Sequence, residues 1–293
     1  MTTSDTAPFT PHWLALREDA DAAARAADLL GPLREHLAGA SRGTGTGTGT
    51  GTGAGPLVVR DLGCGTGSMG RWLSGRLPGP QHWILHDHDP ALLDLAAASL
   101  SGLTAGGGPV TAETREGDLT RLTPADLAGT SLVTASALLD LLTAAEIDAL
   151  AATCTAAGVP VLLGLSVVGE VELGPADPLD AEISAAFNAH QRRTAGGRAL
   201  LGPDALDAAG RAFTRYGATV TTRPSPWRLG ADRSALTAEW LRGWVGAAVE
   251  QEPGLAALAE PYLRRRLVDC AAGRLTAVVG HGDLLALPGG DAR

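Results

Sequence analysis

A glycine-rich turn between an apolar strand and an amphipathic helix constrains the fold of this chain more than any other feature. A short buried strand starts at Leu57, and the turn after it carries glycines at alternate positions, Gly63, Gly65 and Gly67. Residues 68–77 then place their apolar side chains on one helical face. Because glycine has no Cβ, the backbone of such a turn can approach a bound group closely. The segment is therefore expected to form a strand–helix unit with a ligand-binding turn.

The alternation of strand and helix patterns continues along the chain. Segments typical of strands recur at 82–86, 110–114, 131–136 and 159–167, and later at 218–222 and 275–279. This spacing predicts an α/β fold with a doubly wound, mostly parallel seven-stranded sheet, an N-terminal helical cap and helical insertions in the C-terminal third. Ligands of such sheets bind beyond the carboxyl ends of the strands, where the strand order reverses.

The sequence divides into four expected regions. Residues 43–55 alternate Gly and Thr, with no strand before them and no Lys-Ser/Thr after them. This pattern predicts a flexible linker rather than a phosphate-binding loop. The regions are an N-terminal helical cap (1–42), the Gly/Thr linker (43–55), the cofactor-binding half of an α/β domain (56–170), and the substrate-side helices and last strands of the same domain (171–293).

The composition excludes several kinds of chemistry. The chain has 23 Lys and Arg against 32 Asp and Glu, so its net charge of −9 leaves no basic excess for a nucleic-acid backbone. Every basic residue is an arginine, which excludes a lysine Schiff base and a lysine-dependent phosphate loop. Three widely separated cysteines indicate neither disulfides nor a metal site. With no signal-peptide or membrane-spanning pattern, a cytoplasmic protein without a membrane partner is expected.

Two classes of cofactor use a glycine turn of this kind. Residues 65–70 match G-x-G-x-x-G, the pattern of nicotinamide and flavin dinucleotide sites. Asp61, two residues before the first glycine, favours the other class. Its carboxylate would repel an anionic pyrophosphate, whereas it would attract the ammonium and sulfonium of S-adenosylmethionine.

The segment resembles the first motif of the class I S-adenosylmethionine-dependent methyltransferases, D/E-x-G-x-G-x-G, in which Asp61, Gly63, Gly65 and Gly67 fill the defining positions. The resemblance implies a Rossmann-like fold, S-adenosyl-L-methionine as cofactor, and binding of its methionine amino end by Asp61. It also implies a set of further cofactor contacts: Cys64 in the turn, Asp87 on the ribose hydroxyls with His88 beside it, Asp118 and Leu119 at the adenine, and Ser136 on the methionine side. Asp89 is the alternative ribose ligand, although its place before Pro90 favours helix capping.

The acceptor is expected to be a small molecule, with anionic compounds and secondary metabolites as candidates. Ser136-Ala137-Leu138-Leu139 stands after the fourth strand, where methyltransferases of adenine bases and glutamine side chains carry Asn/Asp-Pro-Pro-Tyr. The candidate base is His190, and the candidate substrate ligands are Asn188, Arg192, Trp227 and Arg228. A solvated helix face, core packing and a salt bridge are the alternatives for these residues.

Two other functions stay open at this point. They are a Rossmann-type NAD(P)-dependent oxidoreductase and a non-catalytic S-adenosylmethionine-binding member of the fold. The oligomeric state also stays open.

Overall fold

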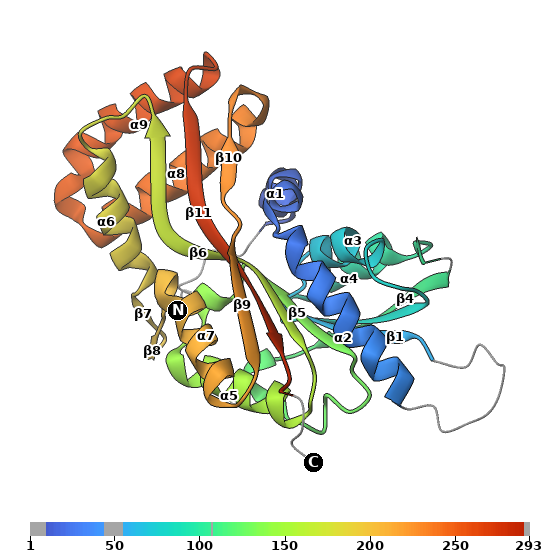
Figure 1. Cartoon of the computed structure of the whole chain (residues 1–293). Helices are drawn as coiled ribbons and strands as arrows, with labels where there is room; N and C mark the ends of the chain where they lie inside the picture. Colours follow the sequence, from blue (N-terminus) through green and yellow to red (C-terminus); the bar gives the residue numbers. More distant parts are fainter. Residues whose placement is uncertain (1–9, 44–54, 107, 290–293) are drawn as a thin grey trace.

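The computed structural model describes residues 10–43, 55–106 and 108–289, and it is built around one large twisted sheet (Figure 1). The strands of this sheet are β1 (Leu57–Leu62), β2 (Gln81–Asp87), β3 (Thr104–Ala105), β4 (Gly108–Glu116), β5 (Leu132–Ser136), β6 (Val161–Gly174), β9 (Thr219–Pro224), β10 (Trp227–Leu229) and β11 (Thr276–Leu287). The order is β10-β11-β6-β5-β1-β2-β4-β3, with β9 also paired to β11. β4, β2, β1, β5 and β6 run parallel, and β11 returns antiparallel beside β6.

Helices cover both faces of the parallel strands, which confirms the doubly wound α/β fold. The helices on one face are α2 (Leu30–Gly43), α3 (Ser68–Ser74) and α4 (Pro90–Leu100), and those on the other are α5 (Ala144–Ala156) and α7 (Ala205–Arg215). Each face buries its own apolar cluster, with Trp83 and Leu85 in the first and Val133 and Leu163 in the second. The strand order reverses between β1 and β5, so the glycine turn after β1 lies at the expected binding edge.

Over residues 10–43, 55–106 and 108–289 the sheet has nine strands rather than the expected seven. One addition is β3, a two-residue strand that pairs antiparallel with β4. The other comes from residues 227–229, which lie between the predicted late strands 218–222 and 275–279. Trp227 starts β10, so β11 pairs with both β9 and β10. Pro224 and Pro226 lack the N–H that a continuous strand would need, which explains the break between the two strands.

β6 and β11 extend past the parallel sheet and carry a helical lobe. The helices of the lobe are α6 (Asp180–Gln191), α8 (Ser234–Gln251) and α9 (Ala256–Ala271), and a small hairpin, β7 (Thr194–Ala195) with β8 (Arg198–Ala199), follows α6. A third apolar cluster fills the lobe, where Trp244 and Tyr262 pack against the outer parts of β6, β10 and β11. The lobe contains the expected helical insertions and stands beside α1 in Figure 1.

The N-terminal segment forms two helices, α1 (Pro11–Ala24) and α2. Pro32 explains why one continuous helix does not form, because proline fits only the first turn of a helix and would clash with the preceding turn anywhere later. α1 contacts β10 and α8, whereas α2 packs against β11 and the α3 side of the sheet. The Gly/Thr run falls almost wholly outside the described residues, so its role as a linker stays a prediction. Among the described helices, none combines the length and apolar character needed to cross a membrane.

Candidate active site

The glycine turn after β1 has a backbone that only glycine adopts readily. Gly63, Gly65 and Gly67 have φ angles of +62°, +54° and +84°. A Cβ on Gly67 would also lie 2.9 Å from Ser99 Oγ and 3.2 Å from Ala96 Cα. The three alternate glycines of the sequence motif therefore meet a conformational requirement of the turn.

Asp87 at the end of β2 holds this turn through backbone hydrogen bonds. Its Oδ2 accepts from the N–H of Gly65 at 2.9 Å, and its Oδ1 accepts from the N–H groups of His88 and Asp89 at 2.8 and 3.1 Å. The carboxylate is buried and fixed beside the turn, as a ribose ligand would need to be. The His88 ring is exposed, with its Nδ1 3.3 Å from Asp87 Oδ1. Asp89 caps α4 by accepting from the N–H of Ala91, which is the capping role expected for it.

Asp61 is a buried carboxylate with one free oxygen. It lies at the end of β1, 1% exposed, and its Oδ1 accepts a 2.7 Å hydrogen bond from the Thr134 hydroxyl. Its Oδ2 is buried and makes no hydrogen bond within the described residues. Burial raises the pKa of Asp61 to about 7, although the Thr134 bond and the charge of Arg25 act in the opposite direction. A carboxylate in this state is set to take up a cationic group.

Arg25, in the connection between α1 and α2, reaches the same edge of the sheet. Its Nη2 donates to Ser136 Oγ at 3.0 Å, and its Nη1 lies 3.4 Å from Met69 Sδ. Its guanidinium also lies over the Trp72 ring, 5.4 Å from the centroid. The connection itself is held by Asp283 on β11, whose Oδ2 accepts from the N–H of Ala26 at 2.8 Å. The N-terminal helices thus place a cation at the candidate site.

Two non-glycine residues adopt positive φ angles beside this edge. Ala137, directly after β5, has φ +51°, and Leu165, inside β6, has φ +56°. The two are adjacent, because the N–H of Ala137 donates to the carbonyl of Gly164 at 2.9 Å. The N–H of Leu165 donates to Asp283 Oδ1 at 2.7 Å, which holds the bend. Backbone strain of this kind costs about 1–3 kcal/mol per residue and clusters at functional sites.

The other predicted cofactor contacts, Cys64, Asp118 and Leu119, have different surroundings. Asp118 follows β4, is exposed, and accepts from the N–H and hydroxyl of Thr120 at 2.9 and 2.6 Å. Leu119 packs against the cluster on the α5 and α7 face. Cys64 is buried, and burial raises the pKa of its thiol well above the ordinary range, which suits packing rather than nucleophilic attack.

The predicted substrate ligands do not converge on one another. Asn188 donates to the carbonyl of Gly169 at 2.8 Å, and Arg192 forms an exposed ion pair with Asp204 at 2.6 Å. Trp227 is buried and donates from Nε1 to Asp21 on α1 at 2.9 Å. Arg228 points to solvent from β10. Substrate contacts by these four residues stay predictions.

His190 lies beside Glu250 of α8, with 3.3 Å between its Nε2 and Glu250 Oε2. A carboxylate that the sequence analysis did not identify, Asp140, is influenced by the same arginine as His190, Arg193. Asp140 follows β5 in a short 3₁₀ turn (Leu139–Leu141), and burial raises its pKa while the charges of Arg17 and Arg193 lower it. Arg193 also approaches His190, with its Nη1 3.4 Å from Nδ1. Burial lowers the pKa of His190, and Arg193 lowers it further. The charge of Arg193 thus acts on both His190 and Asp140.

A family comparison identifies the domain that contains this edge. Residues 59–159 match the family model described as "Methyltransferase domain". These residues form a methyltransferase domain. The match includes Asp61, the glycine turn, Asp87 and Ser136, so the resemblance inferred from the first motif is confirmed.

The methyltransferase domain and its flanking segments are similar to several solved structures. The cyclopropane synthase MmaA2 from Mycobacterium tuberculosis is 12% identical, with a TM-score of 0.43 over 96% of this chain and 100% of that one. The YcgJ protein from Bacillus subtilis is 12% identical, with a TM-score of 0.44 over 88% and 99%. A geranyl diphosphate C-methyltransferase from Streptomyces coelicolor is 11% identical, with a TM-score of 0.41 over 89% and 80%. Likeness at this level identifies no acceptor. No curated protein sequence matches the chain.

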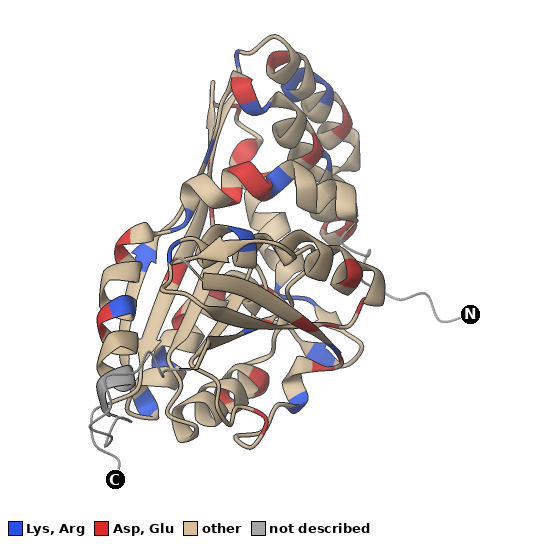
Figure 2. Cartoon of the chain, turned by 90° about the vertical axis from the view of Figure 1, so that its right-hand side faces the viewer, with Lys and Arg blue, Asp and Glu red and all other residues tan. Residues whose placement is uncertain are grey.

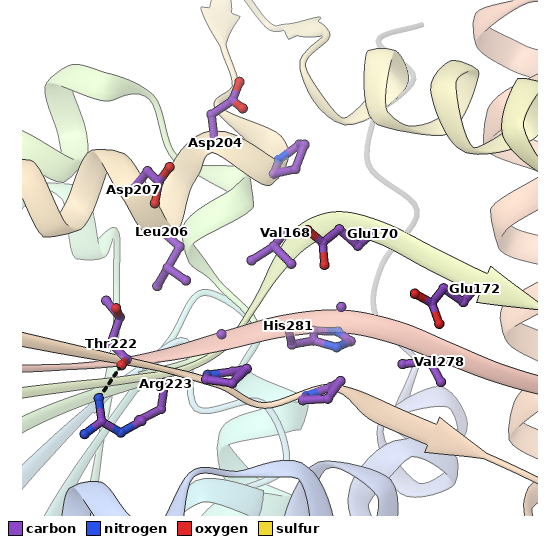
Figure 3. A pocket seen from close by; sticks show the side chains of 15 residues that line it. Val168, Glu170, Glu172, Asp204, Leu206, Asp207, Thr222, Arg223, Val278 and His281 are labelled. Atoms are coloured by element: carbon purple, nitrogen blue, oxygen red, sulfur yellow. Dashed lines mark hydrogen bonds between the residues drawn. The ribbon is translucent and has the colours of Figure 1, made fainter.

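An open cavity of about 550 Å³ lies beside the methyltransferase domain, against β6 and β11 (Figure 3). Its walls come from β6, β9, β11 and the start of α7, and they carry four carboxylates: Glu170, Glu172, Asp204 and Asp207. None of the predicted site residues of the methyltransferase domain lines it. Arg192 does not line the cavity, but it forms an ion pair with Asp204, which does.

The candidate site includes residues that the sequence analysis did not identify. The sequence gives only a weak indication that Asp283 belongs to the site, because this acid stands alone beside an apolar run near the end of the chain. Thr134 lies within the predicted fourth strand and Asp140 follows it, and neither has a distinguishing sequence pattern. Arg25 has no signal at all, since only the folding of α1 and α2 onto the sheet brings it to Ser136.

Proposed function

We propose that this protein transfers a methyl group from S-adenosylmethionine to a small-molecule acceptor. The observation that carries the proposal is Asp61: a buried carboxylate with one free oxygen, directly before a turn of three positive-φ glycines. The methionine end of the donor carries an ammonium, which matches this free oxygen in charge and hydrogen bonding. Asp87 stands at the other side of the turn, where a vicinal diol offers two donors to one carboxylate.

Residues of this chain can position the reactants, and positioning is the main requirement for this reaction. When bound, S-adenosylmethionine supplies an electrophilic methyl group on a sulfonium. Ser136 and the strained Ala137 lie at the end of β5, next to the proposed donor site. A rigid edge of this kind holds a nucleophile near attack distance, which lowers the barrier without a covalent intermediate. For an acceptor that is protonated at neutral pH, Asp140 and His190 are the candidate bases.

The hydrogen bonding of the turn disfavours the dinucleotide alternative. Dinucleotide sites use free backbone N–H groups of the turn to bind the pyrophosphate. Here the N–H of Gly65 already donates to Asp87, and the N–H of Gly67 donates to the carbonyl of Cys64. Asp61 and Asp87 add two carboxylates where a pyrophosphate would lie, and each would repel it.

A small acceptor is supported by the cover that α1 gives to this edge. Leu14 of α1 lies 3.3 Å from the position of a Cβ on Gly65, and Glu18 forms a 2.6 Å ion pair with Arg71 on α3. α1 thus lies against the turn, where it would help to enclose a small bound ligand. Positions of both charge signs are interspersed over the face shown in Figure 2, which does not suit a nucleic-acid backbone.

Calorimetric titration with S-adenosylhomocysteine tests the proposal. We expect one binding site in the wild type, with affinity reduced about 10- to 150-fold in Asp87→Asn, the range for a hydrogen bond to a charged group. Asp89→Asn is the matched control, because Asp89 is a neighbouring carboxylate that only caps α4. No binding by the wild type, or equal losses in both variants, would contradict the proposal.

The two alternatives have their own readouts. Tight NADH or NADPH binding would favour the oxidoreductase. Release of S-adenosylhomocysteine from S-adenosylmethionine with a panel of small hydroxyl, amine and carboxyl acceptors separates an enzyme from a non-catalytic binding protein.

A further inference from the structure

Among the residues that the structure describes, Arg25 is a buried cation without an ion-pair partner. Arg25 is 5% exposed. No carboxylate of the described residues lies within 4.0 Å of its guanidinium. Three carboxylates act on it from further away: Asp21, Asp61 and Asp283. Burial lowers the pKa of Arg25 in spite of them, so its charge is poorly compensated.

Two of these three carboxylates are fully engaged elsewhere. Asp21 accepts from Arg17 at 2.9 and 3.3 Å and from the Trp227 indole at 2.9 Å. Asp283 accepts from the N–H groups of Ala26 and Leu165 and from the hydroxyl of Ser225 at 2.6 Å. Asp61 alone has an oxygen left over, its buried Oδ2. The site thus holds one unpaired cation and one incompletely bonded carboxylate at the same edge of the sheet.

A zwitterion matches this pair of opposite charges. Burying an unpaired charge is costly, and two such charges persist together where a ligand compensates both. The proposed donor ends in an α-amino acid, with a carboxylate and an ammonium on one carbon. We propose that Arg25 binds the carboxylate of the donor while Asp61 binds its ammonium. This assignment rests on the proposed function and adds the residue that recognises the amino-acid end.

The contacts of Arg25 hold its guanidinium in place for this role. Ser136 Oγ and Met69 Sδ accept from its two terminal nitrogens, and the Trp72 ring supports it from one side. Its Nε is buried and donates to no acceptor among the described residues. A guanidinium binds a carboxylate through two parallel N–H groups. If one terminal nitrogen of Arg25 gives up its present acceptor, that nitrogen and Nε together provide such a pair.

The assignment is tested by comparing the affinities of two ligands for the wild type and for variants of Arg25. The ligands are S-adenosylhomocysteine and its analogue without the α-carboxylate, 5′-(3-aminopropylthio)-5′-deoxyadenosine, and the proteins are the wild type and Arg25→Met. We expect the wild type to bind S-adenosylhomocysteine at least about tenfold more tightly than the analogue in calorimetry. Arg25→Met should lose this preference and bind the two ligands equally. Arg25→Lys should recover part of it, because the charge remains without the fork.

Arg71→Met is the matched control. Arg71 is a neighbouring arginine that already has a carboxylate partner, Glu18, so its loss should change the affinity for both ligands by the same factor. Equal binding of the two ligands by the wild type would overturn the assignment, and so would an undiminished preference in Arg25→Met. Tighter binding of S-adenosylhomocysteine by Arg25→Met would also overturn it, because Arg25 would then occupy the ammonium position. Failure of the wild type to bind S-adenosylhomocysteine would overturn the proposed function itself.

Discussion

The proposed donor-binding edge of the sheet, at the ends of β1, β2 and β5 (the donor edge), and the helical lobe differ in how their buried charges are paired. In the lobe, Arg266 is 3% exposed and donates to both oxygens of Asp180, at 2.5 and 2.7 Å, and to the carbonyl of Pro175. At the donor edge, Arg25 is buried to a similar degree and makes no ion pair with the described part of the chain. Both arginines leave Nε without a partner, so the idle N–H does not distinguish them. What distinguishes them is the carboxylate partner, which Arg266 has and Arg25 lacks. We therefore infer that the charge of Arg266 stabilises the fold, whereas the charge of Arg25 is available to a ligand.

The largest expected difference is between the stabilities of the variants Arg266→Met and Arg25→Met. Arg266→Met leaves the half-buried Asp180 without its cation, so we expect a loss of about 3 kcal/mol in the free energy of unfolding, the lower end of the range for a buried pair. Arg25→Met removes a charge that has no ion-pair partner, so its loss should stay below about 1 kcal/mol. Urea denaturation followed by circular dichroism measures both. Equal losses in the two variants would remove the contrast between the two regions.

Neutralising Asp61 should affect ligand affinity rather than stability, as we expect for Arg25. Asp61→Asn keeps an oxygen for the Thr134 hydroxyl but removes the negative charge. We expect binding of S-adenosylhomocysteine to weaken by about 1.5–3 kcal/mol, while the free energy of unfolding is unchanged or increased. Calorimetry and denaturation of the same sample report the two quantities. A large loss of stability without a change in affinity would show that Asp61 serves the fold.

The affinity for S-adenosylhomocysteine should rise with pH through the pKa of Asp61. That pKa is about 7 in the unliganded protein, so the carboxyl is mostly protonated at pH 6 and mostly ionised at pH 8. The ammonium of the ligand favours the ionised form, so binding at pH 6 releases a proton. We expect about a tenfold gain in affinity from pH 6 to pH 8 and little change above it. Titrations in buffers of different ionisation enthalpy check the proton release, and Asp61→Asn should give a flat profile.

The smallest expected effect lies at the rim of the donor edge. Asp118→Ala should weaken binding of S-adenosylhomocysteine by about 1 kcal/mol, because its carboxylate is exposed and screened by water. Asp126→Ala is a close control, since Asp126 accepts from the N–H and hydroxyl of Thr123 in the way that Asp118 does from Thr120. Identical affinities of the two variants would remove Asp118 from the adenine site.

The two regions also differ in what their sequences could predict. The glycine turn was predictable because positive φ angles demand glycine and because the acid before it lies at a fixed distance along one strand. β10 was missed because its pairing depends on the length of β11, about fifty residues later in the chain. Arg25 was missed for the same physical reason. Its place beside Ser136 results from the docking of α1 and α2, which no local pattern encodes.

Equilibrium dialysis with S-adenosylmethionine labelled on its methyl group tests the central claim most directly. If the donor binds at the ends of β1, β2 and β5, the protein will retain one equivalent of label, and S-adenosylhomocysteine will displace it while NADH will not. Retention of no label by the folded protein, or displacement of the label by NADH, would contradict the account.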